Sequence, residues 1–438
     1  EVYSIHTPGV SILVAPAYAL ALRLGVSPRA AVCVFMNLLA AFLAVNVWLF
    51  CRDIQGQTST IHYNPDRAAA PFWPALLSTA AVMLTPPVVF YANLVYPELP
   101  AALFILYAFR HAFPRAVSFD PGSPNRGTGE PGNRRTDDIR TDDNDTLESP
   151  TRPLAHSPSQ LLSSLCIAAL PWLSFRFFLP AFVLAALLVQ RGRAARSTRR
   201  WFALSLALPL LASLALFFAY QYRAFGSLNP AAGYLAQDYG ERGMTSRGTL
   251  DGLFGILLDR GHGILTWSPV YLLALTGLFL LFRERRPLGI WLSVLLLAVY
   301  LPGAQFIFWW GGFAPPPRYM VVPAPLLGGA LCYALARKPR PLFIAFFAPL
   351  LAASLLFGWL GCAHPGLLYK HHHLVTRYLP GFPIRLFPSF VKKGTLTWPL
   401  ALLWGTGIIL LNLWFSARWN RAGMVTRHSP AAQNEPLP

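Results

Sequence analysis

Long continuous runs of apolar residues constrain this chain more than any other feature of its sequence. A helix crossing the roughly 30 Å core of a bilayer needs about 20 residues, and most of these runs meet or approach that length. The runs span residues 30–50, 71–94, 201–220, 267–282, 288–305, 320–336, 341–360 and 398–415. Only a helix satisfies its own backbone polar groups in lipid without closing a barrel. The pattern therefore predicts an all-α, polytopic transmembrane bundle with about 9–11 membrane segments.

The charged residues are few and unevenly placed. They make up 12% of the 438 residues, against about 25% in a typical soluble domain. The net charge is +18, but the basic residues lie in short gaps between apolar runs, at 191–200, 283–286, 337–340 and 418–427. This is the positive-inside pattern, so these gaps are expected to be cytoplasmic. No basic face interleaved with aromatic residues occurs, so nucleic acid is excluded as a partner.

The cytoplasmic gaps set the expected topology. The opposite connections, 223–265, 306–318 and 361–397, become outer loops, and residues 418–438 form a cytoplasmic tail. Residues 1–115 are the first part of the transmembrane module and 161–417 the remainder. Within the latter, 161–190 is interrupted by Pro171 and Pro180, which predicts two short helices or one broken helix going out and back. Counting the membrane crossings back from these loops places residues 91–98 outside, provided that the short segment 9–22 does not cross the membrane.

Residues 116–160 separate the two parts of the transmembrane module. They are rich in Pro, Gly, Asp, Arg and Ser and contain almost no large apolar residue. Such a segment cannot bury enough surface to offset its ordering entropy, so a disordered cytoplasmic loop is predicted.

Three segments carry candidate chemistry, because ionisable residues at membrane depth are costly. Glu98 lies between prolines at the start of an apolar run, either as a helix-dipole partner or as a carboxylate that binds substrate or metal. Tyr3 and His6 precede a helix, either as an interfacial anchor or as a phosphate site at its N-terminus. Arg318 follows three prolines, either as a snorkelling side chain or as a bidentate ligand for a lipid-linked phosphate.

Other polar features favour plainer interpretations. The charges of loop 229–263, among them Asp251 and Asp259, are expected to face water. His371, His372 and His373 are consecutive and diverge in direction, which favours surface residues over metal ligands. The five cysteines have no paired spacing and are interpreted as small buried hydrophobes.

Several of these segments together resemble a known family. Residues 3–16 resemble a Tyr-Ser-x-His-x-Pro-Gly entry into a helix, 91–100 a Tyr…Pro-Glu-x-Pro segment, and 171–176 a Pro-Trp-x-x-x-Arg segment. Residues 226–234 and 261–269 resemble a Gly-rich outer loop and a Gly-x-x-x-x-Ser-Pro helix start, and 309–319 a Trp-x-Gly-Gly…Arg-Tyr block. In this order, from residue 3 to about 336, the chain is similar to the bacterial C-type glycosyltransferases that use a polyprenyl-phosphate sugar. These are related to the protein O-mannosyltransferases and aminoarabinose transferases.

The resemblance implies an enzyme of the inner (plasma) membrane that transfers a hexosyl or pentosyl group, with inversion, on its extracytoplasmic face. Membrane lipid surrounds it, and the acceptor is a glycan, a lipid or a protein. Tyr3, His6 and Arg318 would bind the donor phosphate, while Glu98 would orient the acceptor or a divalent cation. The resemblance fixes no cofactor, and a divalent cation stays open. The family's general-base Asp is expected upstream of Glu1, in a first outer loop that follows a first transmembrane helix. Secondary candidates are Arg176, Asp238, His262 and Tyr319.

Two other classes stay open from the sequence. A polymerase or ligase of lipid-linked glycans would share the topology but depend on Arg242, Arg247 and Arg260 in the outer loops. A membrane transporter would pair two broken helices with charges at mid-bilayer. The sequence shows one such broken segment, residues 161–190, and no matching partner.

The loop 116–160 generates a first prediction. Deleting it should leave membrane insertion and the activity of the full-length protein largely intact, because its composition forbids a packed core. Membrane insertion and activity of the deletion variant are measured beside those of the intact chain. A large loss of either would mean that the segment docks a partner or a substrate.

Overall fold

The structure is a computed structural model that describes residues 7–59, 71–113, 158–194, 199–235, 246–337, 341–368, 377–378, 381 and 384–425. Every regular element within these ranges is a helix, so the predicted all-α class is confirmed. Of the segment predicted to be disordered, 116–160, residues 116–157 lie outside the described residues. Its last three residues, 158–160, differ from the prediction, because they form the start of the helix α6 (Pro158–Leu173). The last helix before the C-terminus continues to Val425, into the predicted tail.

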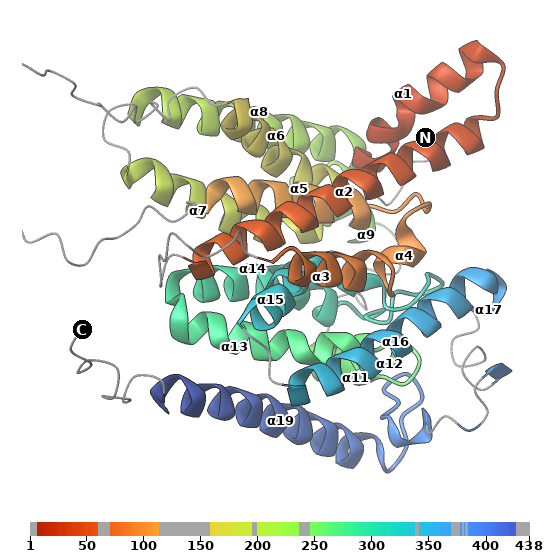
Figure 1. Cartoon of the computed structure of the whole chain (residues 1–438). Helices are drawn as coiled ribbons and strands as arrows, with labels where there is room; N and C mark the ends of the chain where they lie inside the picture. The colour runs from red at the N-terminus through yellow and green to blue at the C-terminus, as the bar shows by residue number, and fades with distance from the viewer. Residues whose placement is uncertain are drawn as a thin grey trace, which may run out of the picture.

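Five helices contain segments long and apolar enough to cross a membrane. They are α2 (Pro28–Ser59), α8 (Arg199–Phe225), α14 (Arg286–Gln305), α16 (Pro341–Ala363) and α19 (Thr397–Val425). Shorter helices of ten or more residues pack with them: α1 (Gly9–Leu24), α3 (Trp73–Met83), α5 (Glu98–Ala112), α6 (Pro158–Leu173), α7 (Phe178–Ala194), α11 (Ser246–Leu258), α13 (Ala274–Glu284) and α15 (Pro323–Ala336). The chain is therefore a helical bundle of membrane-embedded character (Figure 1).

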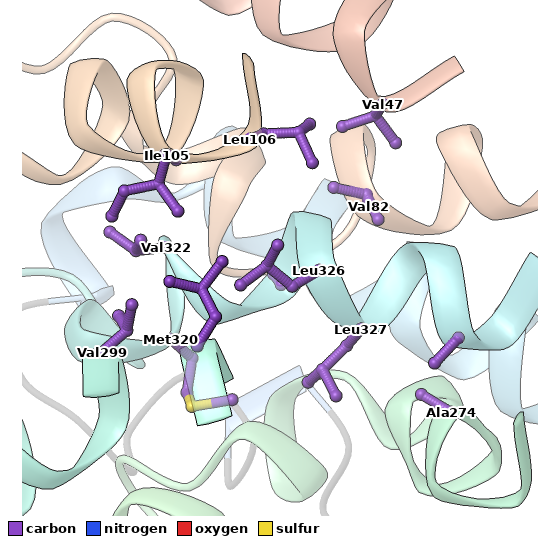
Figure 2. Packing of buried hydrophobic residues seen from close by; sticks show 14 of the residues in the cluster. Val47, Val82, Ile105, Leu106, Ala274, Val299, Met320, Val322, Leu326 and Leu327 are labelled. Carbon is purple, nitrogen blue, oxygen red and sulfur yellow. The ribbon is translucent and has the colours of Figure 1, made fainter. Parts of the chain in front are cut away.

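The central element of the bundle is α15. Each of its residues from Pro323 to Leu335 is buried, as expected for a helix that is apolar on every side. Figure 2 shows its Leu326 and Leu327 among side chains from α2, α3, α5 and α13. Small residues allow this close packing: a Cβ added at Gly277 of α13 would lie 1.7 Å from the carbonyl oxygen of Ala330.

Proline divides two of the predicted apolar runs. The length of the run 71–94 predicts one crossing, but α3 ends at Met83 and a four-residue helix, α4 (Val88–Tyr91), follows Pro86 and Pro87. A proline has no amide hydrogen and clashes with the preceding turn, so the helix stops before the pair. The run 267–282 is divided in the same way before Pro269, into α12 (Ile264–Trp267), the 3-10 helix η5 (Pro269–Leu273) and α13.

Residues 161–190 form two helices, one of the two arrangements that their prolines predicted. The helices α6 and α7 are joined by the 3-10 turn η3 (Phe175–Phe177). The other short elements are α9 (Ala232–Leu235), η6 (Arg318–Met320), α17 (Pro365–Leu368) and η7 (Ile384–Leu386).

The helix α1 does not run the length of the bundle. It forms a hairpin with α2 through Gly25, whose φ of 67° closes the turn in the left-handed region. In Figure 1 this turn projects beyond the bundle at the upper right. We call the end where α5 begins at Glu98 the site end, and the end where α14 begins at Arg286 the opposite end. The site end, to the right in Figure 1, also holds the residues that follow α14 and α8.

A buried polar contact docks α19 on the bundle. The Thr276 hydroxyl of α13 donates to Asn412 Oδ1 of α19 at 2.5 Å, and Asn412 Nδ2 donates to the Ile408 carbonyl. Both side chains are buried. Hydrogen bonds of this kind fix the pairing of helices where apolar contacts alone are not selective.

The contact predicts the effect of Asn412→Ala. Loss of the interhelical hydrogen bond should destabilise the protein by about 1 kcal/mol, seen as a lower unfolding midpoint in a mild detergent. The matched control is Asn37→Ala, since Asn37 is exposed and donates within its own helix to the Cys33 carbonyl. An equal effect of the two substitutions would show that the contact does not hold α19.

Candidate anion-binding site

The site is built around one carboxylate at the start of α5. The Glu98 side chain is 1% exposed, and its Oε1 atom accepts hydrogen bonds from Arg176 Nη2 and from Arg318 Nε, the latter at 2.6 Å. Arg176 comes from η3 and Arg318 from η6 (Arg318–Met320). Two cations and one anion leave a net charge of +1 in a region of low polarity. The cluster is therefore suited to a further anion.

Aromatic rings hold both guanidinium groups in place. Arg176 Cζ lies 4.9 Å from the ring centre of Phe177 and 4.6 Å from that of Tyr319. Arg318 Cζ lies 4.7 Å from the ring of Tyr96 and 5.8 Å from the same Tyr319 ring. Each cation thus contacts two rings, and these cation–π contacts restrict its orientation. An anion that binds here meets donors that are already positioned.

A cavity of about 650 Å³ opens beside the cluster. Arg176, Arg318 and Tyr319 line it, whereas Glu98 lies behind them and does not reach its wall. The remaining wall comes from Tyr220 and from residues within the segments 7–11, 95–97, 173–175 and 302–313. Arg176 Nε is buried and has no hydrogen-bond partner among the described residues. This buried donor is one that the surrounding protein does not satisfy.

The local sequence explains how Arg318 reaches this position. Gly311 and Gly312 have φ angles of 93° and 63°, in the region that glycine adopts without strain. A Cβ at Gly311 would lie 2.8 Å from the Cβ of Arg318, so only glycine admits the arginine. The Tyr91 hydroxyl donates to the Pro315 carbonyl at 2.7 Å and fixes the proline segment that ends at Arg318.

A second buried carboxylate lies nearby but outside the cavity. Asp259 Oδ1 accepts from the backbone N–H groups of Gly261 and His262 at 2.8 and 3.0 Å, and Oδ2 accepts from Phe390 N–H at 2.7 Å. Burial raises the pKa of Asp259, and these backbone hydrogen bonds oppose the shift. The His262 ring is also buried and meets Trp309 edge-on at 6.4 Å. The expectation that the charges of this loop face water is therefore wrong for Asp259, whose role is to join two loops.

The structure brings together four of the candidates from the sequence: Glu98, Arg176, Arg318 and Tyr319. His262 belongs to the separate Asp259 cluster. Tyr3, His6, Asp238 and residues 371–373 lie outside the described residues. Thr7 and Ser11, which follow His6, line the cavity, so the segment that contains Tyr3 and His6 leads toward it. The aromatic residues Tyr96, Phe177 and Tyr220 were missed as individual contributors.

The structure shows what Glu98 contacts, and its expected role in orienting an acceptor or a divalent cation stays a prediction. Its Oε1 atom binds two guanidinium groups, whereas its Oε2 atom is buried and has no hydrogen-bond partner among the described residues. Within the described residues, no group of three or more His, Cys, Asp or Glu side chains is placed to hold a metal ion. Through Oε1, Glu98 positions the two arginines.

Comparisons with protein-family models, curated proteins and solved structures found no match to this chain. The evidence for function is therefore the chemistry of the site itself.

The Glu98 cluster predicts strong coupling between its members. Glu98→Ala should destabilise the protein by roughly 3–5 kcal/mol, because it leaves two buried guanidinium groups without an anion. Combining it with Arg176→Ala should cost less than the sum of the single substitutions, since the double variant holds one cation fewer. The measurement is the unfolding midpoint, in one detergent, of the unsubstituted protein, the two single variants and the double variant.

The control for this cycle is Asp251→Asn, which removes the 2.6 Å ion pair with the half-exposed Lys393. The Lys393 side chain is 53% exposed and that of Asp251 13%, so water screens the pair from the lysine side and its loss should cost about 1 kcal/mol. Strict additivity between Glu98 and Arg176, or a loss at Glu98 no larger than that at Asp251, would contradict the ionic cluster.

Proposed function

We propose that this chain is an integral membrane glycosyltransferase that moves a sugar from a polyprenyl-phosphate donor to an acceptor on the extracytoplasmic face. One observation carries the proposal: Arg176 and Arg318, from two distant segments of the chain, converge on one cavity with a net positive charge. Guanidinium groups are the side chains best suited to bind a phosphate through two parallel hydrogen bonds.

The reaction places its largest electrostatic demand on the leaving group. The acceptor hydroxyl oxygen forms a bond to the anomeric carbon, and the bond from that carbon to the phosphate oxygen breaks with inversion. The electron pair leaves on polyprenyl phosphate, and the acceptor proton passes to a general base. Arg176 and Arg318 would stabilise the charge that develops on the phosphate. Because Glu98 and the aromatic rings hold them, little reorganisation accompanies the reaction.

The rest of the cavity suits an amphiphilic donor. Phe306 and Phe308 line it together with Val95, and Phe313, which is 90% exposed, stands at its edge. A charged floor beside an apolar rim matches a phosphate head that continues into a hydrocarbon chain. The volume of about 650 Å³ lies within the range of roughly 300–1,000 Å³ typical of small-molecule sites.

The polymerase or ligase alternative depends on other arginines. Arg242 lies outside the described residues, and so does the side chain of Arg247. Arg260 is described. It follows Asp259 in the chain, its backbone N–H donates to the Pro388 carbonyl, and it is not part of the cavity wall. Of these three arginines, the described Arg260 therefore contributes nothing to the cavity.

Binding measurements test the part of the reaction that these residues supply. Farnesyl phosphate should quench the tryptophan fluorescence of the protein in detergent at concentrations where farnesol has little effect, because the guanidinium groups recognise the phosphate. Equal binding of the phosphate and the alcohol would remove the phosphate site and, with it, the proposed function.

Turnover provides the sharper prediction. Arg318→Lys should lower the transfer of sugar from a polyprenyl-phosphate donor by about tenfold or more, equivalent to roughly 1.4 kcal/mol of transition-state stabilisation. Lysine supplies a point charge in place of a planar fork and stacks poorly on Tyr96.

The matched control is Arg260→Lys, at the same end of the bundle but outside the cavity. It should keep near-normal turnover, and both variants should keep normal expression. Normal turnover in the Arg318→Lys variant, or a larger loss in the Arg260→Lys variant, would overturn the assignment of the phosphate site.

A further inference from the structure

The segment that precedes α19 has an unusual exposed surface. Residues 384–397, which we call the basic–apolar loop, contain three cations beside large apolar side chains. Its exposed cations and large apolar side chains are Arg385, Leu386, Val391, Lys392, Lys393 and Leu396. Leu386 and Leu396 are 56% and 65% exposed. Apolar side chains interleaved with cations are typical of a protein surface that meets lipid head groups.

The basic–apolar loop is held firmly by the bundle. Asp259 Oδ2 accepts from Phe390 N–H at 2.7 Å, and Arg260 N–H donates to the Pro388 carbonyl at 2.9 Å. Trp404 Nε1 donates to the Leu386 carbonyl at 2.8 Å, and its ring stacks on that of Phe387 at 4.5 Å. The exposed cations therefore project from a preorganised frame, which lowers the entropy lost on binding.

The helix that follows indicates how deep the loop lies. Large apolar side chains of α19 are 60–68% exposed in the bundle and form its lipid-facing side: Leu402, Leu403, Ile409 and Leu410. Trp398, in the first turn of α19, is 37% exposed and packs on Phe390. Tryptophan favours the boundary between hydrocarbon and head groups. The basic–apolar loop, which immediately precedes Trp398, therefore lies at the level of the head groups.

We propose that the basic–apolar loop is a binding site for anionic phospholipid at the bilayer surface of the site end. Arg385 and Lys392 contact the head-group phosphates, while Leu386 and Leu396 enter the acyl boundary. Lys393 contributes less, because it is paired with Asp251 at 2.6 Å. This site is distinct from the Arg176–Arg318 cavity and does not depend on the proposed glycosyl transfer.

The test is a lipid titration of the full chain in a neutral detergent, followed by native mass spectrometry. Phosphatidylglycerol should bind more tightly than phosphatidylcholine, and the double variant Arg385→Gln/Lys392→Gln should weaken phosphatidylglycerol binding by about tenfold or more. The double variant Leu386→Ser/Leu396→Ser should weaken the binding of both phosphatidylglycerol and phosphatidylcholine. The matched control, Arg223→Gln, removes an exposed cation at the same end that is not part of the loop.

Three outcomes would overturn the proposal. The first is unchanged phosphatidylglycerol binding in the Arg385→Gln/Lys392→Gln variant. The melting midpoint of this variant in phosphatidylcholine shows that it is folded. The second is an equal loss in the Arg223→Gln variant, which would make the effect one of general charge. The third is full competition by glycerol phosphate, which would indicate a site for free phosphate rather than for a bilayer.

Discussion

A single buried oxygen atom, Glu98 Oε1, joins three distant parts of this chain. It accepts hydrogen bonds from Arg176 and Arg318, which lie 78 and 220 residues away. Burying a cation without an anion is far more costly than burying a neutral side chain, so neither arginine can occupy its place unless the carboxylate is there. The relative positions of α5, η3 and η6 follow from this requirement, and so does the shape of the cavity between them.

The site end contains two buried carboxylates that are stabilised in opposite ways. Glu98 is bound by side-chain cations, and the excess positive charge of that cluster faces a cavity. Asp259 is bound by backbone N–H groups, which carry no net charge, and through them it joins two loops. The same functional group thus holds two side-chain cations in one place and backbone in the other. The difference lies in whether its partners are charged.

Much of this arrangement follows from the sequence, and the rest depends on long-range contacts. The apolar runs predicted the helices, and the residue types in 91–100 and 309–319 predicted that Glu98 and Arg318 have functional roles. That both arginines bind the same carboxylate could not be predicted, because the contact spans much of the chain. Asp259 was misjudged for a related reason: its acceptor role depends on Phe390, 131 residues away. The prolines at 86 and 87 indicate by themselves that the helix ends, but the length of the apolar run 71–94 predicted one continuous crossing.

The complete burial of α15 has a consequence for biosynthesis. Its neighbours include α2, α3 and α5, which leave the ribosome long before it, and α13, which only just precedes it. Until residues 323–336 enter the membrane, α2, α3 and α5 can pack on one another but lack the helix that fills the space between them and α13. The core is therefore completed late, when α15 joins it. A nonsense mutation between α8 and α15 would release inserted helices that cannot complete their core, which makes them substrates for membrane quality control.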